Sequence, residues 1–351
     1  MNLDIALILG ADGLAGGAIY LLAGLGLVLV FSVTRVIFVP FGDIAVFAAL
    51  SLASFQANTM PATVALVATL SFLAVLVEVI GRMRRREFKG MGRVIAGWGL
   101  LPAIPCGLAW LIVGKDTPAM VPICVSILLS IPIAPLVARI ALQPIADASV
   151  LVLLIASLNL HFLLSGLGLL FFGPEGARTS ALVNGTLHLT DSFSVSYQTV
   201  LMIGSALVLS ALFYLAFERT LSGKALRATA VNRVGARLVG IRPGRTALLA
   251  YGCASLLAGL VGVLISPVTT MYYDSGLIIG LKAFVAAIIG GLSSYPLTAL
   301  GAIAVGLVES FASFWSGTMK DVIVFSVLIP ALLLRSWLSV HSEEDPEEIE
   351  S

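Results

Sequence analysis

Apolar runs long enough to cross a lipid bilayer recur along almost the whole chain of 351 residues. A membrane-spanning helix needs about 20 apolar residues, and about eleven candidate runs are present. They lie near residues 13–34, 44–57, 61–80, 94–113, 119–138, 148–172, 198–217, 246–266, 277–292, 296–314 and 321–338. Only 11% of the residues are charged, whereas a soluble domain carries roughly 25%. The sequence therefore predicts an all-α fold, a polytopic bundle of transmembrane helices, and excludes a soluble globular enzyme.

Three of these runs are unusual in length or spacing. The run at 44–57 is short for a hydrocarbon core of about 30 Å. The runs at 277–292 and 296–314 are separated only by a Ser-Ser-Tyr-Pro turn. We therefore expect about 8–11 spans, some of them short or re-entrant helices.

Basic residues are concentrated in two short segments. Of the 20 lysines and arginines, six lie between Arg82 and Arg93 and seven between Arg219 and Arg245. The positive-inside rule places both segments in the cytoplasm. Residues 173–197 hold two acidic residues and one arginine, and we expect them on the external side. With eleven spans, the N-terminus lies outside and the C-terminus in the cytoplasm.

The sequence ends in a strongly acidic stretch. Residues 342–351, SEEDPEEIES, hold six acidic side chains and a proline. Such a composition favours a solvated, disordered tail. Residues 1–341 are predicted to form a single transmembrane domain.

No catalytic or metal-binding pattern is recognisable in the sequence. The three histidines are far apart and form none of the usual metal-ligand spacings. We expect His161, which lies in the middle of a span, to make a hydrogen bond between helices. The pair Gly223-Lys224 is followed by Ala225 and lacks the glycine that a P-loop requires upstream. The chain is thus not expected to be an enzyme, and any ATP hydrolysis would take place on another subunit.

The basic segment at 219–245 is the most specific feature of the chain. From Lys224 to Leu238 it is rich in alanine, leucine and arginine, which favour helix, and Gly240 and Pro243 then act as stop signals. We expect one or two short helices at the membrane surface. They could dock a cytoplasmic partner, or simply contact anionic lipid headgroups.

Four blocks of sequence carry a family resemblance. They are GLAGGAIYLLAGLGLVLVFSVTRVIFVPFGD at 13–43, GKALRATAVNRVGARLVGI at 223–241, AGLVGVL at 258–264, and GLKAFVAAIIGGLSSYPLTALGAIAVGLVES at 280–310. In their order, spacing and glycine pattern they resemble the LivH-type permeases of branched-chain amino acid ABC transporters, a family of binding-protein-dependent inner-membrane components.

The resemblance implies a function and a set of partners. The chain would be the permease of an ABC importer in the bacterial inner membrane, moving branched-chain or related amino acids. Its partners would be a second, LivM-like permease, two cytoplasmic ATPase subunits that carry ATP and Mg²⁺, and a periplasmic substrate-binding protein. No cofactor is expected in this chain; membrane lipid is an expected partner and nucleic acid is not.

The resemblance also marks candidate site residues. The substrate-pathway candidates are Arg35, Phe38, Phe41, Gly42, Asp43, Lys282 and Glu309. The candidates for coupling to the ATPase are Lys224, Arg227, Asn232, Arg233, Arg237 and Gly240. Lys282 and Glu309 lie within apolar runs, where they could form a structural ion pair or line the pathway.

The chain departs from the family pattern in two places. The family usually reads Asn-Phe-Ala-His-Gly where this chain has Phe38-Val39-Pro40-Phe41-Gly42, so phenyl rings replace an amide and an imidazole. Residues 81–120 resemble an insertion with a basic loop and an added hairpin. A permease for urea, amides or another small solute thus remains an alternative, and an ion-coupled secondary transporter is a more distant one.

Overall fold

The computed structural model describes residues 3–84, 86, 91–115, 117–190, 193–292, 294–327, 329–330 and 333. Most of these residues lie in helices. They are α1 (Leu3–Thr34), α2 (Phe41–Gln56), α3 (Thr63–Arg84), α4 (Met91–Ile95), α5 (Leu101–Ile112), α6 (Met120–Ser130), α7 (Ile133–Val137), α8 (Val150–Phe172), α9 (Tyr197–Arg219), α10 (Leu221–Val231), α11 (Arg233–Leu238), α12 (Pro243–Ile265), α13 (Gly276–Ile289), α14 (Tyr295–Trp315) and α15 (Lys320–Ser326). Short π segments, Ala96–Leu100 and Ala138–Leu142, continue α4 and α7, and a 3-10 turn, Gln143–Ile145, follows the second of them.

The predicted transmembrane bundle is confirmed. Within the described residues, seven helical stretches are long and apolar enough to cross a membrane. Shorter apolar helices cover Phe41–Gln56, Ala96–Ile112 and Gly276–Ile289. At 1.5 Å per residue, α2 and α13 reach only about 24 and 21 Å, which agrees with the expectation of short helices in these two places.

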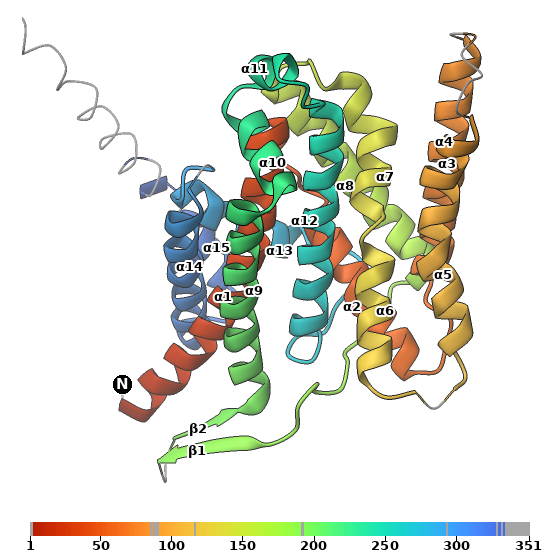
Figure 1. Ribbon diagram of the computed structural model, residues 1–351. Coiled ribbons are helices and arrows are strands. Elements are labelled where there is room, and N and C mark those ends of the chain that lie inside the picture. Colours follow the sequence, from red (N-terminus) through yellow and green to blue (C-terminus); the bar gives the residue numbers. More distant parts are fainter. Residues whose placement is uncertain are drawn as a thin grey trace, which may run out of the picture.

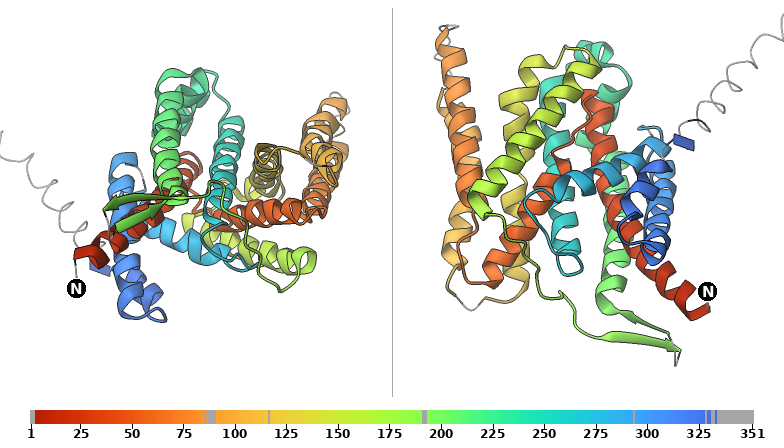
Figure 2. Two further views of the ribbon diagram at one scale, coloured as in Figure 1. Left: turned by 90° about the horizontal axis from the view of Figure 1, so that it is seen from below. Right: turned by 180° about the vertical axis from the view of Figure 1, so that it is seen from behind.

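Helix α1 lies at the centre of the bundle. It packs along α14, α12, α9 and α13 (Figures 1 and 2). Glycines permit the contact with α14, because a Cβ atom at Gly17 would lie 2.9 Å from Ile303 Cα. Close backbone approach of this kind drives helix association where lipid offers no hydrophobic gain.

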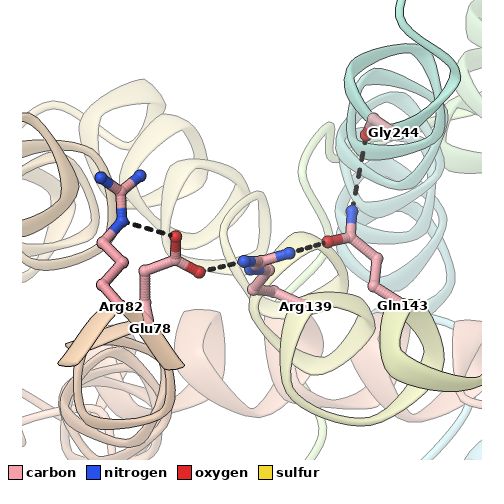
Figure 3. A network of polar contacts seen from close by, with 5 residues as sticks. All are labelled: Glu78, Arg82, Arg139, Gln143 and Gly244. Atoms are coloured by element: carbon pink, nitrogen blue, oxygen red, sulfur yellow. Dashed lines mark hydrogen bonds and ion pairs between the residues drawn. The ribbon is translucent and has the colours of Figure 1, made fainter. Parts of the chain in front are cut away.

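The two ends of the bundle differ in charge and in structure. Helices α10 and α11 and the far ends of α3 and α4 lie at one end, so the two basic segments share one side of the bundle (Figure 1). A polar network at this end joins α3 to α12 (Figure 3). In it Glu78 accepts from Arg82 and Arg139, Arg139 donates to Gln143 at 2.6 Å, and the Gln143 amide donates to the Gly244 carbonyl at 3.4 Å. We call this end the basic end.

The opposite end carries a β-hairpin and the start of α1 (Figure 1). Strands β1 (Thr186–Thr190) and β2 (Phe193–Ser196) pair antiparallel, with Thr186 opposite Ser196. They lie in the stretch 173–197, which the charge pattern places outside. We call this end the hairpin end.

The stretch at 81–120 continues α3 and returns along it as α4, a π segment and α5. The Ser71 hydroxyl of α3 donates to the Trp98 carbonyl. Arg85 and Lys89 of the basic loop, the acidic tail at 342–351 and the C-terminus lie outside the described residues.

Candidate functional site

A buried carboxylate and a buried imidazole meet inside the bundle. Asp43 lies in the first turn of α2 and is 0% exposed, while His161 lies at the middle of α8. The Nδ1 atom of His161 is 2.9 and 2.8 Å from the two carboxylate oxygens of Asp43. The expected interhelical hydrogen bond of His161 is thus formed, and its partner is one of the predicted pathway residues.

The N-termini of α2 and α13 meet at this pair. A Cβ atom at Gly42 would lie 1.8 Å from the Gly276 carbonyl oxygen, and one at Gly276 would lie 2.4 Å from Asp43 Oδ1. Only glycine permits this approach. The partial positive charge of a helix N-terminus favours a carboxylate, so the two helix ends and His161 together stabilise Asp43.

The two phenylalanines at which the chain departs from the family pattern pack against the same junction. Phe38 and Phe41 are both 0% exposed. The Phe38 ring meets Tyr251 edge to face, with centroids 5.1 Å apart, and Phe41 lies over Gly26. In this conformation the motif forms closed core rather than an open channel wall.

A second charged cluster joins four helices. Lys282 of α13 is 4% exposed, and its Nζ lies 2.6 Å from Glu309 Oε1 of α14 and 2.8 Å from Asp321 Oδ1 of α15. The Tyr20 hydroxyl of α1 donates to Glu309 Oε2 at 2.5 Å. The ion-pair alternative for Lys282 and Glu309 is therefore realised, and Asp321 is a third member of the cluster.

A cavity of about 440 Å³ borders this cluster near the hairpin end. Glu309 and Tyr20 line it, together with Asp12, Ser310 and Lys320. Glu309 thus pairs with Lys282 and also faces this cavity, and its role in a substrate pathway stays a prediction. Side chains of both signs, together with the hydroxyl groups that also line this cavity, can hold a zwitterion.

The predicted surface helices are present at the basic end. Thr220 caps α10 by accepting from Gly223 N at 3.0 Å, and Asn232 caps α11 by accepting from Gly235 N at 2.9 Å. Gly240 ends the segment with a φ of 85°, a conformation that favours glycine.

These helices present basic and apolar groups to solvent. Lys224, Arg227 and Arg237 are exposed and Arg233 is half-buried. Leu221 is 86% exposed and Leu238 is 84% exposed. A shallow hollow lies between α10 and α11 and includes Lys224, Arg227 and Asn232. Exposed leucines beside basic side chains make a surface of the kind that contacts another protein or the headgroups of a membrane.

The structure divides the predicted pathway residues among three places. Gly42 and Asp43 lie at the α2–α13 junction, Glu309 borders the cavity near the hairpin end, and Arg35 lines a different cavity near the basic end. Within the described part of the chain, no group of three or more His, Cys, Asp or Glu side chains could hold a metal ion.

Comparison with known proteins gives one consistent set of relatives. The family described as "Branched-chain amino acid transport system / permease component" matches residues 10–333. Over 206 residues the chain is 31% identical to the high-affinity branched-chain amino acid transport system permease protein LivH of Escherichia coli K12. Over 207 residues it is 28% identical to the corresponding permease protein BraD of Pseudomonas aeruginosa.

Both matches cover 56% of this chain and 66% of the relative, just under two thirds of the relatives' length. A probable LivH of Methanocaldococcus jannaschii is 28% identical over 219 residues, which is 59% of this chain and 68% of that protein. No solved structure matches the chain.

Proposed function

Because this chain belongs to the family of permease components of branched-chain amino acid transport systems, we propose that it is the membrane-spanning subunit of an ATP-driven, binding-protein-dependent importer. Its substrates are branched-chain or related amino acids, carried across the bacterial inner membrane. The proposed orientation places the basic end and the C-terminus in the cytoplasm. Urea, amides or another small solute are the alternative substrates.

The exposed surface of α10 and α11 is the observation that carries this proposal. A permease that hydrolyses no ATP itself must receive force from a separate ATPase, and this requires a rigid contact surface at the cytoplasmic end. The two capped helices supply it. Thr229 of α10 accepts a hydrogen bond from the Thr246 hydroxyl of α12 at 3.1 Å, so a push on α10 reaches a membrane-spanning helix directly.

A polar group on the outer face of the bundle supports the second permease as a partner. Asn159 of α8 is exposed, two residues before the buried His161 and near the middle of the span. An amide facing hydrocarbon is costly unless another helix satisfies its hydrogen bonds. The neighbouring face of α8 is apolar, with Ile155 and Phe162 52% and 59% exposed.

Reconstituted uptake tests the function. The permease pair, its ATPases and the binding protein are placed in proteoliposomes, and leucine uptake is measured with ATP inside. We expect uptake to require ATP and the binding protein. Uptake driven by an ion gradient through this chain alone would instead establish a secondary transporter.

Charge reversal tests the docking surface. The double variant Lys224→Glu/Arg237→Glu changes two exposed side chains that make no ion pair among the described residues. We expect at least about tenfold weaker association of the ATPase subunits, because both charges contribute to partner recognition. Lys115→Glu, in the α5–α6 connection at the hairpin end (Figure 1), is the control. If the ATPase subunits associate equally with the double variant and with the control, this surface is not their docking site.

A further inference from the structure

A large, mostly apolar cavity lies among α1, α9, α10 and α14 at the basic end. Its volume is about 910 Å³. Leu25, Leu207 and Phe217 are among the apolar residues that line it, and Arg35 and Arg227 are its two basic residues. This cavity is separate from both the Asp43 junction and the cavity beside Glu309.

The length of this cavity is close to the thickness of one leaflet of a bilayer, and its lining on α1, from Leu21 to Val33, covers about 18 Å. Its lining on α9 runs from Leu207 to Phe217, which is about 15 Å at the helical rise of 1.5 Å per residue. Half of a hydrocarbon core of about 30 Å is also about 15 Å. On α1 the last lining residue is Val33, and Arg35, directly after the last residue of α1, also lines the cavity. The basic residues therefore lie where headgroups of that leaflet lie.

Arg35 is held at the mouth of the cavity in an unusual backbone conformation. It is exposed and has a φ of 63°, a left-handed conformation that non-glycine residues seldom adopt and that is common at functional sites. None of the ion pairs found among the described residues includes Arg35. Arg227, in contrast, has its Nη2 3.1 Å from Glu218 Oε2. The mouth thus offers one guanidinium without a carboxylate partner, a good bidentate donor for a phosphate.

We propose that this cavity binds an anionic phospholipid of the cytoplasmic leaflet, with its phosphate on Arg35 and an acyl chain along α1, α9 and α14. The other side of α9 faces the bilayer, since Val208 and Leu212, which do not line the cavity, are 58% and 56% exposed. The cavity is open beside this helix, since its lining residues Leu207 and Tyr214 are 61% and 60% exposed, so a lipid can enter sideways. The lipid would then fill the space between α9 and the central helix α1. This proposal does not depend on which solute is transported.

Two other occupants explain the cavity less well. An amino acid could place its carboxylate on Arg35, but a cavity of about 150 Å³ already holds a benzene molecule, so most of 910 Å³ would stay empty. A helix of the second permease could cover the apolar wall, but it would bury Arg35 without supplying a phosphate.

Lipid titration of the purified transporter tests the proposal. Native mass spectrometry and thermal unfolding are followed while phosphatidylglycerol or phosphatidylcholine of identical acyl chains is added. We expect phosphatidylglycerol to bind and stabilise the protein, and Arg35→Gln to weaken this binding about tenfold or more, the effect of losing a charge-assisted hydrogen bond. Arg242→Gln removes an exposed arginine at the same end and should change nothing.

A second variant tests the role of the cavity while the charge of Arg35 is kept. Ala211→Trp keeps Arg35 and fills part of the cavity beside α9, and it should also lose phosphatidylglycerol. Three results would overturn the proposal: equal binding of both lipids, unchanged lipid binding in Arg35→Gln, or displacement of the lipid by millimolar inorganic phosphate. So would an Ala211→Cys crosslink to the second permease in a preparation that holds no lipid.

Discussion

The Asp43–His161 pair places two ionisable groups in the interior of a membrane protein, where each depends on the other. Asp43 is 0% exposed and His161 is 3% exposed. Removing one member of such a pair leaves a buried polar group without compensation, which is far more costly than replacing both. The pair therefore couples α8 to the junction of α2 and α13.

We expect His161→Leu to destabilise the protein by about 3–5 kcal/mol, the usual cost of breaking a buried pair. The double variant His161→Leu/Asp43→Asn should lose less than the sum of the two single variants. Thermal unfolding in lipid nanodiscs measures both effects. His188→Leu, on the exposed hairpin strand β1, is the matched control, and a loss there equal to that of His161→Leu would contradict the assignment.

The Lys282 cluster gives a parallel prediction. Lys282 is 4% exposed and forms ion pairs with both Glu309 and Asp321, so Lys282→Met should leave two carboxylates close to each other without a cation between them. We expect a loss of about 3–5 kcal/mol, partly restored by adding Glu309→Gln. Lys320→Met, which removes a neighbouring but less buried lysine, should cost much less in the same unfolding assay.

Some of these contacts could be predicted from the sequence and others could not. The Glu78–Arg82 pair follows from i,i+4 spacing on one helix, and the Lys282–Glu309 pair from two charges in neighbouring apolar runs. Asp43 and His161 are 118 positions apart, and no local pattern connects them. Arg139 reaches Glu78 only because the π segment after α7, Ala138–Leu142, lies beside α3.

At the scale of the helices, the apolar periodicity located the spans because each must satisfy its backbone within the bilayer. The run predicted at 246–266 corresponds to α12 at Pro243–Ile265, and the run at 148–172 to α8 at Val150–Phe172. What hydropathy could not show is that α2 and α13 begin inside the bundle, facing each other. That arrangement depends on close backbone contacts between Gly42 and Gly276.

Gly42→Ala tests this junction. The added methyl would meet the Gly276 carbonyl, so α2 and α13 must move apart, and overpacking of this kind typically costs about 1–3 kcal/mol or more. Gly81→Ala is the control, since Gly81 also lies in a helix but no atom lies within 4 Å of its added Cβ. We expect lower stability and less leucine uptake in Gly42→Ala, and values at least equal to the unmodified protein in Gly81→Ala, because alanine favours helix.

At the scale of the whole molecule, burial is uneven around the bundle. In the most apolar part of α1, 83% of the residues are buried, whereas in that of α9 only 11% are. Helices α3 and α8 are intermediate, at 28% each. The outer helices therefore present the surfaces that lipid and other subunits contact, and the polar Asn159 distinguishes α8 from α9.

We expect Asn159→Leu to weaken the association of the two permeases without unfolding this chain. A hydrogen bond between membrane helices contributes about 0.6 kcal/mol on average and up to about 2, so the dissociation constant should rise between about twofold and thirtyfold. Co-purification at graded detergent concentrations measures it. Ser210→Leu on α9, where the hydroxyl already bonds the Leu207 carbonyl, is the control, and equal loss in both variants would argue against an interface on α8.

The meeting of two helix starts inside the bundle also has a consequence for biosynthesis. Asp43 leaves the ribosome 118 residues before His161, a delay on the order of ten seconds at normal elongation rates. Gly276, which meets Asp43 at the start of α13, follows later still. During that interval α2 carries a carboxyl group without its partner, so the early helices cannot yet pack as they do in the complete bundle. A chain truncated before α8 should accordingly be cleared by membrane proteases, even though its first helix is intact.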